Sequence, residues 1–328
     1  MRPQGDGLGV PYLERLRARI ADGLAPDALG WAADQAAIYG LGLGLQETLR
    51  YLLGERPSLA SFENWVAGRN GGGLSAERIA AVNEAVRRAL SGDWARIADP
   101  DLPSPLDEQD LRCWDASGYV VLRQAVPMAG AVAAARAIWD FLGMSPDDPA
   151  GWDDGSRRDG LWVPLLRHPA FDANRASPRI RGAFAQLWGT CELIVTVDQG
   201  GFNPPLRPDQ PFRGQGLHWD TSLMPPMPLG MQGILYLTDT PAEQGAFRCV
   251  PGFHKRVDDW VASLPPGADP RQQDLSADAV CIGARAGDMV IWHAALPHGA
   301  SPNRGAAPRL VQYISCFPPG RLDPRPWV

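Results

Sequence analysis

The sequence contains very little lysine and few cysteines. Of its 31 basic residues only Lys255 is a lysine, and 37 acidic residues leave a formal net charge of −6. A chain with this charge has no overall attraction for nucleic acid or for an anionic membrane, so we expect neither as a partner. The five cysteines lie far apart and form no C-x-x-C pair, which argues against a disulfide framework or a thiolate zinc site.

Long apolar runs are missing as well. The most apolar stretch, residues 36–46, is too short and too rich in glycine to cross a bilayer, and the first residues lack the apolar core of a signal peptide. We therefore expect a cytoplasmic protein. The sequence also contains no G-x-S-x-G, H-E-x-x-H or strand-linked G-x-G-x-x-G motif, so hydrolases and NAD-dependent enzymes have no support.

The 328 residues are 45% apolar, which is enough for one large core or for two domains. Up to about residue 90, apolar side chains such as Leu13, Leu16 and Ile20 recur at helical spacing. These predicted apolar faces must be covered. We expect them to pack on the β-rich core, on one another, or on a second subunit in a homodimer. Glycines at residues 40–44 predict close helix approach, and those at residues 68–73 predict a turn.

A polar, proline-rich segment at residues 99–105 predicts a linker, so we place a helical region at 1–100 and a second domain at 101–328. The second domain opens with a predicted helix and a strand at 118–122, and helices are expected near 131–142 and 178–187. Short apolar strands then alternate with turns, which predicts an α+β fold dominated by a β-sandwich or barrel. The expected strands are 192–198, 230–238, 246–250, 280–284, 288–293 and 309–317.

Four of the five histidines lie in this β-rich region, which favours a metal site. In His218-Trp219-Asp220 an imidazole and a carboxylate are two residues apart, and such residues point to the same side of an extended chain. A third ligand from a later strand would complete the two-histidine, one-carboxylate triad of non-haem iron(II) sites. His293 and His298 compete for that role.

The position of Arg309 decides between the two histidines. It lies eleven residues after His298 and opens a predicted strand, where an inward guanidinium would suit a carboxylate. Arg304 has the same spacing from His293, but it lies in a turn-like Pro-Asn-Arg-Gly run. We therefore predict His298 as the third ligand, with His293 packed beside the site.

Together these residues resemble the phytanoyl-CoA dioxygenase-like (PhyH) family of Fe(II)/2-oxoglutarate-dependent oxygenases over residues 106–318. Two positions depart from the family pattern, because Phe253 replaces a serine and Ala300 stands where a serine is common. The segments that carry the resemblance are residues 115–122, 218–220, 245–255, 286–288 and 298–303, followed by Arg309.

The resemblance implies a double-stranded β-helix, or jelly roll, with buttressing helices and a helical N-terminal extension. It implies Fe(II) held by His218, Asp220 and His298, the co-substrates 2-oxoglutarate and O2, and an ion pair between Arg309 and 2-oxoglutarate. The implied activity is a dioxygenase that hydroxylates or otherwise oxidises a C–H bond, and we expect its substrate to be a small specialised metabolite. The alternatives are a cupin-like metal-dependent isomerase and a non-catalytic binding module.

Further residues are expected near the same site. The predicted additional contacts to 2-oxoglutarate are Gln199, Asn203, Tyr236 and Ser301. The predicted contacts to the substrate are Trp162, Trp219, Arg248 and Phe253.

Overall fold

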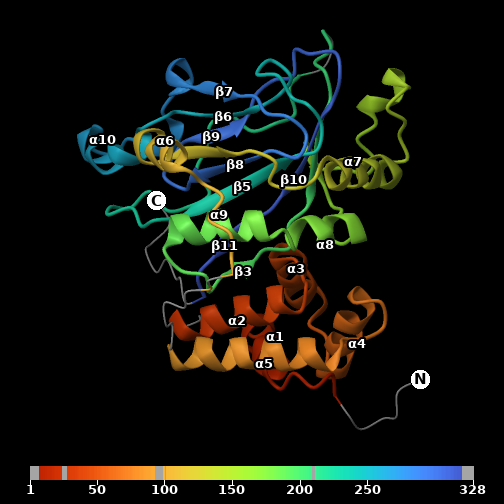
Figure 1. Cartoon of the computed structure of the whole chain (residues 1–328). Coiled ribbons are helices and arrows are strands. Elements are labelled where there is room, and N and C mark those ends of the chain that lie inside the picture. Colours follow the sequence, from red (N-terminus) through yellow and green to blue (C-terminus); the bar gives the residue numbers. More distant parts are fainter. Residues whose placement is uncertain (1–6, 24–27, 93–98, 100, 209–210, 320–328) are drawn as a thin grey trace. The chain divides into compact units, whose positions relative to one another are not determined.

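The structure is a computed structural model of the chain, and it describes residues 7–23, 28–92, 99, 101–208 and 211–319. The described residues form two compact units (Figure 1). The first unit comprises the described parts of residues 1–98, 188–198 and 317–324, and the second comprises residues 99–187 and 199–316 with the same restriction. The boundary expected at residue 100 falls beside residues 93–98 and 100, which lie outside the described part of the chain.

The first unit is mainly helical, and the apolar faces of its helices pack on one another. Leu13 and Leu16 belong to the same buried cluster as Val82 and Val86. A Cβ at Gly40 would lie 3.0 Å from a methyl group of Val82, so this glycine allows the close helix approach that the sequence predicts. The helices are α1 (Tyr12–Ala21), α2 (Ala28–Gly40), α3 (Leu45–Glu55), α4 (Leu59–Arg69) and α5 (Ala76–Ser91).

The second unit is a jelly roll of two antiparallel sheets. The larger sheet has the strand order β1-β8-β5-β10-β4-β2, and the smaller has the order β7-β6-β9. The larger sheet contains β1 (Tyr119–Leu122), β2 (Trp162–Val163), β4 (Gly200–Asn203), β5 (Met231–Tyr236), β8 (Met289–His293) and β10 (Arg309–Tyr313). The smaller contains β6 (Phe247–Cys249), β7 (Val280–Ile282) and β9 (His298–Ala300).

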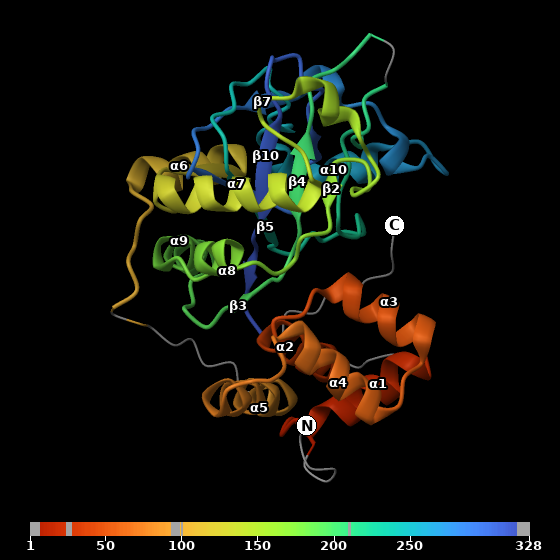
Figure 2. The same cartoon turned by 90° about the vertical axis from the view of Figure 1, so that its right-hand side faces the viewer.

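Helices cover one face of the larger sheet, and the smaller sheet covers the other (Figures 1 and 2). Side chains alternate along the strands. Gln312 therefore faces the helices and hydrogen-bonds Phe171 and Asn174 of α8, whereas Val311 packs inside the jelly roll. The helices of this unit are α6 (Glu108–Ser117), α7 (Met128–Leu142), α8 (Pro169–Arg175), α9 (Pro178–Trp188) and α10 (Val257–Ser263).

One expected strand belongs elsewhere, and three strands, β2, β4 and β9, lie outside the expected ranges. The run at 192–198 forms only the short β3 (Ile194–Val195), which pairs with β11 (Cys316–Phe317) and lies in the first unit. The unpredicted β4 begins with two glycines. A Cβ at Gly200 would lie 3.0 Å from Ile138 of α7, so close packing against the helix explains this glycine where a strand-forming residue is usual.

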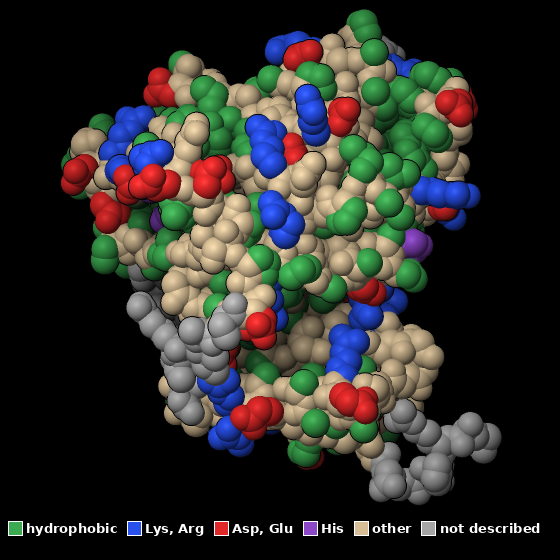
Figure 3. Space-filling view, in the orientation of Figure 1, with side chains coloured by type: hydrophobic (Ala, Val, Ile, Leu, Met, Phe, Trp, Pro, Cys, Tyr) green, Lys and Arg blue, Asp and Glu red, His purple; other side chains and the backbone are tan. Residues whose placement is uncertain are grey.

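The described residues include no helix long and apolar enough to span a membrane. Figure 3 shows basic and acidic side chains interspersed over the second unit on the face presented. Neither sign of charge forms a continuous patch there.

Candidate metal centre

Two histidines face each other across a short antiparallel bridge. The backbone N–H of His218 donates to the carbonyl of His298 at 2.9 Å, and the N–H of His298 donates back to His218 at 3.0 Å. The ring centroids are 4.8 Å apart. His298 is buried at the start of β9, so the bridge fixes both imidazoles at one edge of the smaller sheet.

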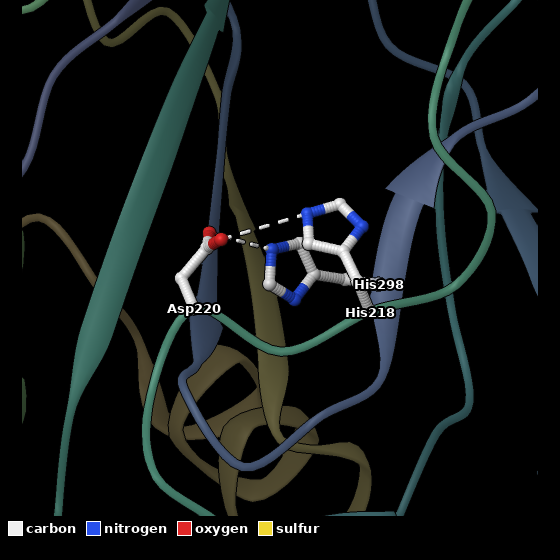
Figure 4. Close-up of side chains that lie close together, drawn as sticks. All are labelled: His218, Asp220 and His298. Carbon is white, nitrogen blue, oxygen red and sulfur yellow. Dashed lines mark ion pairs between the residues drawn. The ribbon is translucent and has the colours of Figure 1, made fainter. Parts of the chain in front are cut away.

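Asp220 completes a cluster of three ligand groups (Figure 4). Its Oδ1 lies 3.6 Å from Nε2 of His218, and its Oδ2 lies 3.3 Å from Nε2 of His298. One ligand atom from each residue lies within 4.8 Å of the others. Two imidazoles and one carboxylate are the ligand set of the non-haem iron(II) facial triad, so the donor atoms fit Fe(II).

Backbone carbonyls fix the orientation of both imidazoles. Nδ1 of His218 lies 2.9 Å from the carbonyl of Gly216, and Nδ1 of His298 lies 3.0 Å from the carbonyl of Leu296. A neutral imidazole that donates from Nδ1 keeps its lone pair on Nε2. With Nδ1 against the backbone, Nε2 is the nitrogen of each ring that faces Asp220 and would bind a cation.

The charge states of the cluster also suit a cation. Burial, with repulsion from His298, lowers the pKa of His218, so its imidazole is neutral at neutral pH. Burial alone would raise the pKa of Asp220, but hydrogen bonds and charge from His298, with a hydrogen bond from Gln232, hold it well below its usual range. The cluster thus offers the neutral imidazole of His218 and the carboxylate of Asp220 beside the ring of His298.

Arg309 is a buried guanidinium at the start of β10, with 1% of its surface exposed. It is hydrogen-bonded to Tyr313, but its Nε and Nη2 are buried and have no hydrogen-bond partner among the described residues. A buried charge with unsatisfied donors is costly unless an anion binds it. These two nitrogens therefore fit one carboxylate of 2-oxoglutarate.

The other residues predicted to bind 2-oxoglutarate differ in whether their polar atoms already have hydrogen-bond partners. Asn203, opposite Arg309 in register, donates through Nδ2 to the carbonyls of Gly245 and Ser301, at 3.3 and 3.0 Å. Oγ of Ser301 is buried and has no partner within the described part of the chain.

The hydroxyl of Tyr236 donates to the carbonyl of Ile282 and accepts from the backbone N–H of Phe247, both at 2.8 Å, so backbone groups occupy it. The structure gives Gln199 one backbone contact, in which its carbonyl accepts from the N–H of Tyr313 at 3.1 Å.

The predicted substrate contacts are dispersed. Trp162 is 36% exposed on β2, and its ring lies 4.6 Å from that of Tyr313. Trp219 and Phe253 are buried in an aromatic cluster, with ring centroids 5.9 Å apart. Arg248 lies between two buried residues of β6, so its side chain is on the face of the smaller sheet that points away from the core.

The remaining histidines lie apart from the cluster. Nδ1 of His293 accepts the N–H of Ala295 at 3.0 Å, and its ring lies 5.3 Å from that of His254. His254 in turn hydrogen-bonds the carbonyl of Asp115 through Nε2, and His168 caps helix α8. The structure brings His298 rather than His293 next to the H-x-D pair.

Sequence reasoning missed residues that contact the cluster. Gln232 donates through Nε2 to Oδ2 of Asp220 at 2.8 Å, and the ring of Trp292 lies 5.0 Å from that of His298. Alternation along the predicted strand 230–238 offered a signal for Gln232, because it shares a face with Ile234 and Tyr236. Arg271, whose guanidinium binds the main chain around Asp220, had no such signal.

A family model described as phytanoyl-CoA dioxygenase (PhyH) matches residues 114–311. A Dictyostelium discoideum protein named for phytanoyl-CoA dioxygenase is 22% identical over 258 residues, which cover 63% of this chain and 74% of that protein. Dioxygenase olcK from Penicillium canescens is 28% identical over 162 residues, which cover 47% of this chain and 46% of that protein. The epimerase SnoN, solved with Fe3+, alpha ketoglutarate and nogalamycin RO, is 19% identical with a TM-score of 0.46, covering 64% of this chain and 83% of SnoN.

Proposed function

This chain belongs to the phytanoyl-CoA dioxygenase (PhyH) family of Fe(II)/2-oxoglutarate-dependent oxidoreductases, and from that membership we propose the reaction and the residues that perform it. The reaction is hydroxylation of an unactivated C–H bond in a small specialised metabolite. The metal ligands are His218, Asp220 and His298, and Arg309 anchors 2-oxoglutarate.

The observation that carries this proposal is the pairing of two unlike sites within one unit. Two imidazoles and one carboxylate lie close enough together in the second unit to hold a cation, and the same unit contains a buried guanidinium with two donors that lack a partner among the described residues. A structural metal site would need no such arginine. A buried arginine is costly unless a carboxylate pairs with it, and neither a cupin-like isomerase nor a binding module requires a carboxylate ligand at this position.

Each protein group has a defined task. Bound in this site, Fe(II) supplies redox chemistry with O2 as 2-oxoglutarate is converted to succinate and CO2. The backbone carbonyls behind His218 and His298 hold their Nε2 atoms toward the metal, and Arg309 orients the distal carboxylate of 2-oxoglutarate. Phe247 and Trp292 pack beside the ring of His298, with centroids 6.1 and 5.0 Å away, and exclude water from that side.

A shallow pocket in the second unit adjoins Asn203, the register partner of Arg309. The lining combines apolar side chains with two arginines, and Arg207 forms an ion pair with Asp153. The lining residues include Leu161, Pro204, Leu206, Phe212 and Arg213.

The test is a substrate screen with the full chain, Fe(II), 2-oxoglutarate and O2, in which succinate and substrate mass are both measured. The proposal expects succinate to form together with a product that has gained one oxygen atom. Product of unchanged mass, formed without 2-oxoglutarate, would identify an isomerase instead. An Arg309→Met variant is the matched control, because it keeps the three metal ligands and removes the anion site.

A further inference from the structure

Asp220 is the ligand that regular structure supports least. His218 and His298 are joined by two reciprocal backbone hydrogen bonds, whereas Asp220 lies two residues farther on, in a bend. Half of its side-chain surface, 50%, is exposed, compared with 5% for His298. A carboxylate in such a segment needs other contacts to stay aimed at a metal ion.

Gln232 contacts the carboxylate directly. Its Nε2 donates to Oδ2 of Asp220 at 2.8 Å, and Gln232 lies on β5, which pairs with β8 on one side and β10 on the other. The backbone of a glutamine on a central strand is held by ladder hydrogen bonds, so its amide is a fixed point for the half-exposed carboxylate. The amide takes one lone pair of Oδ2, which makes Oδ1 the oxygen with more free lone pairs for a cation.

Arg271 holds the main chain on both sides of the same residue. It belongs to the short helix η3 (Pro270–Gln272), and its Nη1 donates to the carbonyl of Trp219 at 2.9 Å. Its Nη2 donates to the carbonyl of Thr221 at 2.6 Å. The two carbonyls flank Asp220, so one planar guanidinium fixes the direction in which its side chain leaves the chain.

We propose that Gln232 and Arg271 are positioning residues that hold Asp220 as a one-oxygen ligand of the metal ion. The inference rests on the proposed metal site and adds two residues that lie outside its H-x-D motif. Gln232 fixes the carboxylate, Arg271 fixes the backbone, and neither side chain is itself a metal ligand. Loss of either contact lets Asp220 turn toward solvent and weakens metal binding.

The first experiment measures the affinity of the full-length apoprotein for Mn²⁺, by electron paramagnetic resonance of the free ion. Gln232→Leu keeps the size of the side chain and removes the donor, so the dissociation constant for Mn²⁺ should rise by about 10- to 100-fold. Gln232→Glu places a second carboxyl group beside Asp220 in place of the donor, so the geometry of the bound ion should change as well, which the Mn²⁺ spectrum reports.

The matched control is Gln312→Leu. Gln312 lies on the adjacent strand β10 but faces helix α8, where it hydrogen-bonds Phe171 and Asn174. This change should lower the thermal midpoint and leave the affinity for Mn²⁺ unchanged. If Gln232→Leu also lowers only the thermal midpoint, Gln232 has a structural role and the inference is wrong.

Arg271→Lys provides an independent measurement, because lysine keeps the charge and loses the two-pronged geometry. We expect its Mn²⁺ affinity to fall roughly tenfold. Wild-type affinity in this variant would remove Arg271 from the inference. If the His298→Ala variant binds Mn²⁺ as tightly as the wild-type chain does, the proposed metal site is wrong, and the positioning roles fall with it.

Discussion

At the scale of single residues, the site separates a place for a cation from a place for an anion. The imidazoles of His218 and His298 are held with Nδ1 on backbone carbonyls, and Asp220 carries the single negative charge between them. Arg309 supplies two buried cationic donors that have no partner among the described residues. In the proposed function, 2-oxoglutarate uses both places, with one end on the metal and the other on the guanidinium.

The first prediction concerns the identity of the third metal ligand. His298→Ala should abolish turnover and Mn²⁺ binding, because it removes one of three ligands and leaves the H-x-D pair alone. His293→Ala removes a ring that packs near His254 and should keep a measurable share of both. Metal titration and succinate formation on both variants check this, and the reverse ranking would show that His293 is the ligand.

The second prediction concerns Arg309→Lys. A lysine keeps the charge but replaces two fixed N–H donors with one compact ammonium group. Because hydrogen bonds to charged groups contribute about 1.5 to 3 kcal/mol, the apparent requirement for 2-oxoglutarate should rise roughly tenfold or more. The affinity of the apoprotein for Mn²⁺ should stay unchanged. An unaltered 2-oxoglutarate dependence would place the anion site elsewhere.

The sequence could predict that His218, Asp220 and His298 lie together, but only the first two are related by a local rule, whereas His298 is chosen from the position of Arg309 and the family resemblance. Residues i and i+2 share a side of an extended chain, so His218 and Asp220 are expected to lie side by side from their spacing alone. Alternation places Gln232 on the inward face of its strand but does not identify the residue it contacts, and Arg271 has no local signal at all. Their partner, Asp220, becomes adjacent only when β5 and the segment of η3 pack around the bend that follows His218.

At the scale of elements, the strands with apolar alternation were predicted and the glycine-rich strand was not. The predicted run 288–293 contains β8, and the run 246–250 contains β6. In contrast β4 begins with glycines, because helices α7 and α8 and the side chains of β10 leave no space for a Cβ. Strand propensity describes how well a residue fits a half-buried sheet. In β4 the packing of neighbouring side chains, which only glycine accommodates, outweighs that propensity.

The third prediction tests this packing with Gly201→Ala. The added Cβ would lie 2.8 Å from Cγ2 of Val311 and 3.2 Å from the ring of Tyr313, both on the strand that carries Arg309. We expect a loss of about 1 to 3 kcal/mol in the free energy of unfolding, measured in urea, together with a weaker 2-oxoglutarate response. Gly151→Ala, where the nearest atom is 3.4 Å away, is the control and should change stability by less than about 0.5 kcal/mol. Equal stability of the two variants would contradict the packing argument.

At the scale of the whole molecule, the first unit is not a simple N-terminal domain. It includes β3, which lies between α9 and β4 in the sequence, and the end of β11, which follows β10. Ile194 of β3 packs against the helical core, and the ring of Phe317 lies 5.7 Å from that of Tyr39 in α2. Arg88 of α5 forms an ion pair with Glu192 at 2.7 Å. The helices therefore cover apolar side chains of β3 and β11, and removal of the residues before the linker would expose these side chains.

The fourth prediction follows for a chain that begins at Asp101. It keeps His218, Asp220 and His298, yet it exposes Ile194 and Phe317 to water, so it should aggregate and unfold at a lower temperature than the full chain. Light scattering and a thermal scan measure both effects. Ile194→Ser and Phe317→Ser, added to the shortened chain, should recover part of its solubility, because they remove the apolar groups that the helices normally cover. A shortened chain that stays monodisperse with the thermal midpoint of the full chain would show that the helices contribute nothing to the stability of the remainder.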